Sequence, residues 1–366
     1  MVAVLLRDAP MQQMHALPGL RCFPIWATDI FAPARLTRTG GIRLAKLLEV
    51  MHLKKYFPLE QRGILQRING YVKAVDDISF SIEKSMTLGI VGESGCGKST
   101  AGRTILRLYE PTDGTIIFDG VDITRLTKQD MRLYRKRMQI IFQDPLSSLD
   151  PRWKIRKLLT EPLDVFRNDL SKAEKSEKIQ SLLDIVGLPG FHAERYPHEF
   201  SGGQRQRIGI ARALTLDPEF LVCDEPVSAL DVSIQSQVLN LLLDIQQRLD
   251  LTYLFISHDL SVVRFISDRI GVMYLGKLVE MADAEEIFSH SAHPYTNALM
   301  KALPIPNPKK KRGYAPLQGE VPNPANPPDG CHFHGRCPQC MEVCKEQVPE
   351  WNEVSPGHFV TCHLFS

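Results

Sequence analysis

The 366-residue sequence contains no apolar run that approaches the roughly 18 residues needed to span a bilayer. Its first residues, MVAVLLRDAP, also lack the basic start, long apolar segment and small-residue cleavage site of a signal peptide. We therefore expect a cytosolic protein, and persistent disulfides are rare in that compartment. The formal net charge is only +2, which argues against broad nonspecific attraction to nucleic acid.

The composition is otherwise that of an ordinary globular protein, with 43% hydrophobic residues, so a chain of this length can bury a substantial core. Residues 1–45 have no sustained period and predict a poorly ordered extension. Residues 46–300 alternate short β-like runs with helical patterns, which is typical of an α/β fold. Residues 301–366 combine a proline-rich linker with a cysteine-rich tail.

Two segments of the α/β region give clear local predictions. TIIFDGVDIT, residues 115–124, predicts a hairpin with Asp119 and Gly120 at its turn. QSQVLNLLLDIQQRL, residues 235–249, predicts a helix that Asp231 or Ser233 could cap. The residues expected on the buried face of that helix are Val238, Leu241, Leu242, Ile245 and Leu249.

The strongest local pattern is TLGIVGESGCGKST, residues 87–100, in which an apolar β-like run meets G-x-x-x-x-G-K-S. Its glycines let the backbone wrap around a phosphate, so that N–H groups point inward. Lys98 adds a cation for the β- and γ-phosphates, Ser99 offers a hydroxyl to Mg²⁺, and the following helix turns its positive N-terminus toward the anion. The predicted nucleotide-binding residues are Gly92, Glu93, Ser94, Gly95, Cys96, Gly97, Lys98, Ser99 and Thr100.

A second chemical feature is FLVCDEP, residues 220–226, where two carboxylates follow a short apolar run. The run predicts a buried strand, and Asp224 at its end is suited to hold Mg²⁺ or its water shell. Glu225, one residue further, is suited to polarise an attacking water as a general base. Alone this pattern is weak, and it gains weight because it follows a phosphate loop.

The segment FSGGQRQR, residues 200–207, places small residues before a predicted helix. Ser201, Gly202 and Gly203 therefore predict a second helix N-terminus that can bind phosphate. Gln143 lies in IIFQDP, SALD spans residues 228–231, and His258 ends the β-like run in FISHDL.

Together with the phosphate loop and the Asp-Glu pair, these motifs resemble, in their order, those of the ATP-binding cassette family. The resemblance covers about residues 46–300 and departs from the commonest pattern at Phe200, where leucine is more usual. It implies a P-loop NTPase (RecA-like) cassette with an antiparallel β subdomain and a helical subdomain at about residues 145–215. It also implies that ATP is the substrate, that Mg²⁺ is the metal, and that the chain is an ATPase.

The resemblance also assigns roles to single residues. It implies that Glu225, His258 and Gln143 are catalytic, and that Ser99, Asp224 and Gln143 hold Mg²⁺. Two cassettes would dimerise head to tail, with ATP clamped between residues 92–99 of one chain and a surface of the other chain that contains the family's signature motif, FSGGQRQR, and its D-loop, SALD. The residues implied on that second surface are Ser201, Gly202, Gly203, Gln204 and Asp231. The family stacks adenine on an aromatic residue upstream of the phosphate loop, for which Tyr56, Phe57 and Tyr71 all stay open.

Several longer segments narrow the resemblance to one subfamily of ATP-binding cassette proteins. KAVDDISF, FQDPLSSLDPR, DEPVSALDVS, HPYTNAL and GEVPNPANPPDGCHFHGRC are similar to the ATPase subunits of bacterial oligopeptide and dipeptide importers. This implies a peripheral subunit on the cytoplasmic face of the inner membrane. Its partners would be a second ATPase, two membrane permease subunits and, indirectly, an external peptide-binding protein, with no nucleic acid. An importer of another solute, such as a nickel chelate, and a regulatory ATPase that senses its metal state are the alternatives.

The tail CHFHGRCPQCMEVC, residues 331–344, holds four of the eight cysteines. In a reducing compartment, clustered thiols suggest a metal before a disulfide. Cys331, Cys337, Cys344 and Cys362 resemble the iron–sulfur tail of peptide-importer ATPases, and four thiolates suit a [4Fe–4S] cluster. Cys340 makes a zinc-like C-x₂-C pair with Cys337, so zinc and unligated thiols stay open as alternatives.

Overall fold

The computed structural model describes residues 45–60, 68–144, 148–303 and 319–366. The expectations for residues 1–44 and for most of the proline-rich linker, 304–318, fall outside these described residues.

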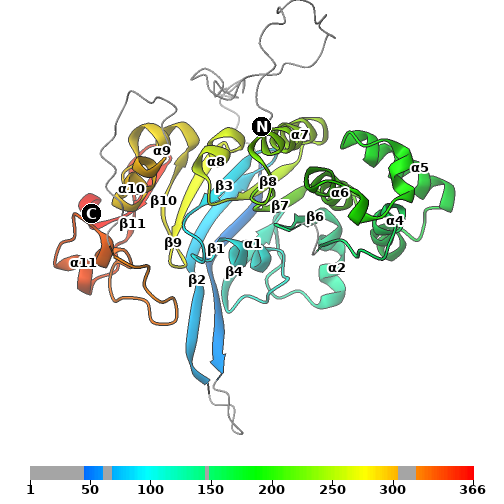
Figure 1. Ribbon diagram of the computed structural model, residues 1–366. Helices are drawn as coiled ribbons and strands as arrows, with labels where there is room; N and C mark the ends of the chain where they lie inside the picture. The colour runs from blue at the N-terminus through cyan, green and yellow to red at the C-terminus, as the bar shows by residue number, and fades with distance from the viewer. Residues whose placement is uncertain (1–44, 61–67, 145–147, 304–318) are drawn as a thin grey trace, which may run out of the picture. The chain divides into compact units, whose positions relative to one another are not determined.

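A sheet of eight strands forms the centre of the fold (Figure 1). β6, β7, β8, β3 and β9 run parallel, whereas β10, β12 and β11 continue the sheet in antiparallel fashion. β3, β7 and β8 are buried along their whole length, which explains their unbroken apolar sequences. In spatial order the strands are β6 (Met138–Ile141), β7 (Phe220–Asp224), β8 (Thr252–Ile256), β3 (Thr87–Val91), β9 (Arg269–Tyr274), β10 (Lys277–Asp283), β12 (His358–Thr361) and β11 (Trp351–Ser355).

A second, antiparallel sheet has the order β2-β1-β4-β5. Asp119 and Gly120 between β4 and β5 both have positive φ, 50° and 79°, as a two-residue type I′ hairpin turn requires. The predicted hairpin is therefore confirmed. The strands are β1 (Lys46–Glu60), β2 (Ile68–Glu83), β4 (Asp113–Phe118) and β5 (Val121–Asp122).

Helices flank the two sheets, and three of them, α4, α5 and α6, group together as a helical subdomain (Figure 1). Ser171 opens α5 with a capping box that it forms with Glu174. The helices are α1 (Lys98–Ile105), α2 (Lys128–Arg137), α4 (Ile155–Phe166), α5 (Lys172–Ile185), α6 (Gly202–Leu214), α7 (Val232–Leu249), α8 (Leu260–Ile266), α9 (Ala284–His290), α10 (Pro294–Ala302) and α11 (Val343–Glu346).

Helix α7 follows the predicted pattern with one correction. Val238, Leu242 and Ile245 are buried as expected, but Leu249 is 46% exposed and Leu239 is buried instead. Leu249 is the last residue of the helix, where the neighbouring elements no longer cover the apolar face. Asp231 stands at the N-cap position, although its side chain makes no capping hydrogen bond.

Two apolar clusters make up the core. One lies between the antiparallel sheet, α1 and one face of the main sheet, and contains Leu48, Ile105 and Phe118. The other joins the main sheet to the helical subdomain, and it includes Phe333 from the tail. β12 of the tail pairs with β10, so the described tail packs as an extension of the core.

Candidate functional site

The phosphate loop connects β3 to α1 and takes a backbone shape that only glycine fits. Gly92 has φ 155°, and a Cβ there would lie 2.1 Å from the carbonyl oxygen of Met273. Gly97 has φ 105°, and a Cβ there would lie 1.9 Å from the carbonyl oxygen of Ala74. Both positions therefore exclude any side chain, because the flanking backbone approaches so closely.

Lys98 folds back over this loop. Its side chain is buried, and its ammonium donates to the carbonyl oxygens of Gly92, at 2.8 Å, and Glu93, at 2.9 Å. The cation is thus held at the loop by two carbonyl oxygens, with the sulfur of Cys96 at 3.7 Å. Cys96 is buried beside it, and burial raises the pKa of its thiol, which therefore stays protonated and weakly reactive near neutral pH.

Ser99 and Asp224 come together as the sequence predicts. The Ser99 hydroxyl donates to Oδ1 of Asp224 at 2.6 Å, and Asp224 is fully buried at the end of β7. Arg103, which we did not single out from the sequence, donates to the other carboxylate oxygen at 3.1 Å and compensates its charge. A hydroxyl and a carboxylate side by side form the oxygen-rich surface that Mg²⁺ prefers.

The three predicted catalytic residues also meet. Gln143 follows β6 and donates through Nε2 to Oε2 of Glu225 at 2.8 Å, and Nδ1 of His258, after β8, lies 3.3 Å from the same oxygen. Glu225 has φ 47°, a left-handed conformation that is costly for a residue with a side chain. Its N–H donates to the carbonyl of Ile256, which holds it there. The residues therefore converge at the carboxyl ends of neighbouring parallel strands.

The segment FSGGQRQR, residues 200–207, forms the capped start of helix α6. Ser201 caps α6 by accepting from the N–H of Gln204, whose side chain accepts in return from the N–H of Ser201. Gly203 packs so close to Ile234 that a Cβ would lie 2.4 Å from its Cγ2. Among the described residues, no hydrogen bond or ion pair joins 201–204 to the phosphate loop at 92–99. The two segments predicted to bind phosphate thus lie on separate surfaces of the described chain, and Asp231 is exposed.

The three candidates for adenine stacking lie on the antiparallel sheet and differ in environment. The Tyr56 hydroxyl donates to Asp76, and burial with that hydrogen bond raises the pKa of Tyr56. Phe57 packs edge-to-face on Tyr109 at 5.5 Å, whereas Tyr71 is 47% exposed. The assignment stays a prediction.

Two residues outside the predicted set contact Glu93 in the loop. The hydroxyl of Tyr295 accepts a hydrogen bond from the N–H of Glu93, and Arg336 pairs with its carboxylate. Tyr295 lies in HPYTNAL and Arg336 in CHFHGRC. Both segments resemble those of peptide-importer ATPases, but the sequence alone assigned no role to either residue. No local pattern signals a contact across 243 residues.

Comparison with known proteins identifies the family. The family model described as "ABC transporter" matches residues 75–228, and "Oligopeptide/dipeptide transporter, C-terminal region" matches residues 279–344. The chain is 57% identical over 323 residues to the oligopeptide transport ATP-binding protein AppF of Bacillus subtilis (strain 168), covering 87% of this chain and 98% of that protein. This chain belongs to the ATP-binding subunits of the oligopeptide and dipeptide ABC transporters. It is therefore an ATPase whose hydrolysis is coupled to transport.

Another relative and two solved structures are also similar to this ATPase subunit. A protein of Brucella abortus (strain 2308) named as a peptide import ATP-binding protein is 52% identical over 316 residues, which cover 86% of this chain and 97% of that protein. A dimeric ATP-binding cassette in a post-hydrolysis state, bound to ADP and Pi, is 26% identical, with a TM-score of 0.57 over 65% of this chain and 98% of that one. The cbiO1 protein of Clostridium perfringens shares the fold, at 24% identity and a TM-score of 0.57, over 67% of this chain and 91% of that one.

The cysteine tail of the ATPase subunit contains free thiols. None of the seven cysteines in the described part of the chain forms a disulfide. Within the same residues, no three His, Cys, Asp or Glu side chains form a group that could hold one metal ion. No described helix is long and apolar enough to cross a bilayer.

Proposed function

We propose that this ATPase subunit powers the import of di- or oligopeptides, with Glu225 as the base that activates the attacking water. This assignment rests on one observation: the side chains of Gln143 and His258 both contact the carboxylate of Glu225. Glu225 directly follows Asp224, which accepts a hydrogen bond from Ser99. A carboxylate held in position by neighbouring side chains can act as a general base toward a water molecule.

Each remaining residue of the loop has a role that follows from its geometry. Lys98 would exchange its bonds to the loop carbonyls for the β- and γ-phosphates, and the backbone N–H groups at the start of α1 would hold the same anion. Ser99, Asp224 and Gln143 would hold Mg²⁺, which neutralises phosphate charge when it is bound. His258, with a side chain 54% exposed, is free to reach the γ-phosphate.

We also infer that the complete site needs a second ATPase. Ser201, Gly202, Gly203, Gln204 and Asp231 lie on a surface with no polar contact to residues 92–99 of the described chain, so their phosphate contacts would be made across an interface. The dimeric cassette with bound ADP and Pi supports this arrangement. Closing two such surfaces on ATP would expel water and align the attacking water with Glu225.

An apolar groove offers a place for a membrane subunit. It lies between β6 and α4, and its lining includes Phe142 and Val165, which are 37% and 45% exposed. Phe142 directly precedes Gln143, which donates to Glu225. A protein bound in the groove that displaced Phe142 would therefore also displace Gln143 on the γ-phosphate side of the proposed site. We assign this groove to the permease. The subunit would then act as a peripheral protein on the cytoplasmic face, with two permeases and, indirectly, an external peptide-binding protein.

The tail is proposed to hold a [4Fe–4S] cluster. Burial, together with the neighbouring thiols of Cys344, Cys362 and Cys337, raises the pKa of the Cys331 thiol to about 11. The charges of Cys362 and Cys344 also raise the pKa of Cys337, so these thiols lie within electrostatic range of one another. Four thiolates are the ligand set of a [4Fe–4S] cluster. Cys340 is exposed and is the cysteine we leave out.

Metal analysis tests the cluster. Anaerobically purified protein should be brown and contain iron and acid-labile sulfide, and Cys340→Ser should retain both. A colourless protein with one zinc per chain, or loss of metal in the Cys340→Ser variant, would overturn the assignment.

Co-purification tests the transport function. The tagged chain should bring down two integral membrane proteins and a second ATPase, and peptide together with its binding protein should stimulate hydrolysis by that complex. A chain that copurifies only with soluble partners, in a manner that depends on its metal content, would instead support the regulatory alternative. Stimulation by a nickel chelate but not by peptides would change the cargo.

A further inference from the structure

The phosphate loop is contacted by the C-terminal tail. Arg336 lies 243 residues after Glu93, yet its two terminal nitrogens donate to the two carboxylate oxygens at 2.8 and 3.1 Å. This is the two-pronged geometry in which arginine binds a carboxylate most specifically. The Arg336 side chain is only 7% exposed, and that of Glu93 is 26% exposed.

The pair is costly to build. A guanidinium that leaves water loses its hydration, and a buried ion pair gains little stability over an apolar pair of similar size. The bond to Glu93 raises the pKa of Arg336 further, so the charge persists at every working pH. Arg336 also lies over the ring of Tyr274 on β9, with its guanidinium carbon 5.9 Å from the ring centre. Such a pair is better suited to fix a geometry than to add stability.

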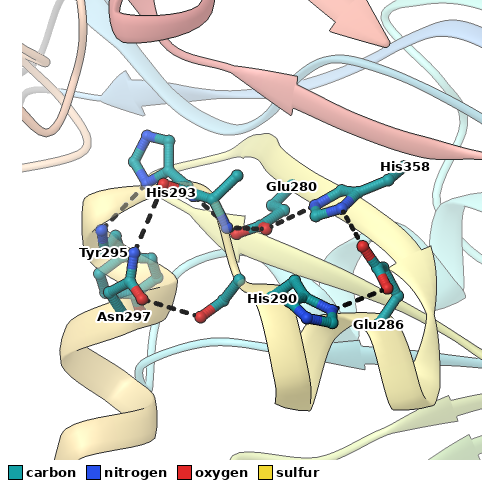
Figure 2. Close-up of polar contacts among 9 residues, drawn as sticks. Glu280, Glu286, His290, His293, Tyr295, Asn297 and His358 are labelled. Atoms are coloured by element: carbon teal, nitrogen blue, oxygen red, sulfur yellow. Dashed lines mark hydrogen bonds and ion pairs between the residues drawn. The ribbon is translucent and has the colours of Figure 1, made fainter. Parts of the chain in front are cut away.

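Glu93 is fixed at its backbone as well. Its N–H donates to the hydroxyl of Tyr295 at 3.0 Å. Tyr295 is fully buried, and its own N–H donates to Nδ1 of His293 at 3.1 Å. The N–H of His293 in turn donates to the buried carboxylate of Glu280 on β10 (Figure 2). One residue of the loop is therefore anchored through both its side chain and its main chain.

These anchors act on the lysine of the loop. The carbonyl oxygen of Glu93 is one of the two that accept from the ammonium of Lys98, at 2.9 Å. A shift of Glu93 would move this acceptor and the loop N–H groups that follow it. The chain of contacts thus runs from Arg336 through Glu93 to Lys98.

The tail has independent anchors, so Arg336 is not needed merely to attach it. β12 pairs with β10, and the fully buried Phe333 packs on Tyr274 and Tyr295 with ring centres 5.3 Å apart in each case. His332 also lies 3.2 Å from the carbonyl oxygen of Leu275 through Nδ1. These contacts would remain without the guanidinium.

We propose that Arg336 is a positioning residue for ATP binding, which holds Glu93 and thereby keeps the phosphate loop in its binding form. The proposal rests on the assignment of residues 92–99 as the phosphate site. It makes nucleotide affinity a property of the C-terminal tail as well as of the cassette.

The test compares ATP affinity in the full chain among Arg336→Gln, Arg336→Lys, Glu93→Gln and the double variant Arg336→Gln/Glu93→Gln. Loss of a charged, two-pronged contact should weaken Mg-ATP binding roughly tenfold or more in each Gln variant, measured with a fluorescent ATP analogue. The double variant should be no weaker than either single one, because both remove the same interaction. Arg336→Lys keeps the charge and should restore part of the affinity. In hydrolysis assays KM should rise while kcat at saturating ATP changes little.

Arg264→Gln is the matched control. Arg264 also pairs with a glutamate, Glu285, and lies over an aromatic ring, Phe288, so its loss should leave ATP affinity unchanged. Iron content and the circular dichroism spectrum should show that the tail of each variant is intact. Since Glu93→Gln leaves the tail sequence untouched, it must reproduce the loss even if Arg336→Gln unfolds the tail.

The possible outcomes distinguish a failure of the phosphate-site assignment from a failure of the positioning role of Arg336. A wild-type chain that does not bind Mg-ATP would overturn the phosphate site itself. Wild-type binding with affinities of Arg336→Gln and Glu93→Gln within twofold of it would overturn only the positioning role. A fall in kcat with KM unchanged would also contradict it, because positioning of the loop acts on nucleotide binding.

Discussion

At the scale of single residues, the chemistry centres on one carboxylate oxygen. Oε2 of Glu225 is the meeting point of Gln143 and His258, which come from different strands. The left-handed backbone of Glu225 costs on the order of 1 kcal/mol or more, a strain that typically persists where function needs it. The contacts with Gln143 and His258 hold the Glu225 carboxylate, the proposed base, in one position in the absence of ATP.

Replacement of that base gives the first prediction. Glu225→Gln keeps the size and the hydrogen-bonding capacity of the side chain but cannot take a proton from water. We expect ATP turnover to fall by at least ~100-fold, with ATP binding retained. Steady-state phosphate release measures the loss of turnover, and equilibrium binding of ATP measures whether binding is retained. Glu177→Gln, on the exposed face of α5, is the control, and near-normal turnover by Glu225→Gln would contradict the assigned role.

The second prediction concerns pH and the buried ion pair of His358. Hydrogen bonding to Glu280, at 2.8 Å, and to Glu286 raises the pKa of His358 above its usual 6.5. Protonated His358 therefore stabilises the fold, fully below about pH 6.5, and this contribution is lost as pH rises through the raised pKa. The neighbouring His293, whose pKa is lowered to about 4 by burial, stays neutral over that range.

We expect the free energy of unfolding of wild type to fall relative to that of His358→Gln as the pH rises above about 6.5. Denaturant titrations of both proteins at each pH measure the difference, in which titrating groups that do not contact His358 cancel. A difference that is constant with pH would mean that His358 does not change its charge in this window. His290→Gln, at an exposed partner of Glu286, serves as the control.

Some of these residues could be read from the sequence and others could not. Lys98, Ser99 and Asp224 belong to compact motifs whose spacing encodes their function. Arg103 and Arg336 belong to none, because their roles depend on which side chains the fold brings to Asp224 and Glu93. Charge alone does not distinguish them from the many surface arginines.

At the scale of elements, one rule explains most of the site. β3, β7, β8 and β6 are parallel neighbours, so the residues that follow their carboxyl ends gather at one edge of the sheet. The phosphate loop, Glu225, His258 and Gln143 each follow one of these strands. Since short apolar runs followed by polar residues are visible in the sequence, this assembly was predictable.

The pairing of the tail with the core was not predictable. β12 has only four residues and β11 only five, without an apolar alternation long enough to distinguish a strand from a turn. Their place at the edge of the main sheet depends on β10, some 75 residues earlier, and on contacts such as that of His358 with Glu280. Proline-rich sequence before the tail suggested a tether, but it carries no information on where the tail docks.

Phe333 gives the prediction for this junction. It is 1% exposed and packs against Tyr274 and Tyr295, so Phe333→Ala leaves a cavity between the tail and the sheet. The free energy of unfolding should fall by roughly 3–5 kcal/mol in a denaturant titration. Phe191→Ala is the matched control, because Phe191 is 70% exposed and its loss should cost less than about 0.5 kcal/mol. Equal effects of the two substitutions would show that the tail does not dock as described.

At the scale of the whole molecule, the proposed function divides the nucleotide site into two half-sites on separate surfaces of the chain. The loop at 92–99 offers Lys98 and a helix N-terminus, and α6 offers a second N-terminus capped by Ser201. Each half alone leaves part of a bound triphosphate facing water. If a second ATPase supplies the missing half, as we propose, nucleotide binding and association should be thermodynamically linked.

The last prediction tests that linkage through the cap of α6. In the Glu225→Gln background, Mg-ATP should drive the chain into a pair with the second ATPase of its importer, or with another copy of itself, and ADP should not. Adding Ser201→Asp should abolish the pair, because its carboxylate would face the γ-phosphate, whereas Asp caps helices as well as Ser and so preserves α6. Ser201→Thr, which adds no charge, should still pair. Light scattering after gel filtration measures the mass, and ATP-dependent pairing by the Ser201→Asp variant would show that α6 does not contact the nucleotide across the interface.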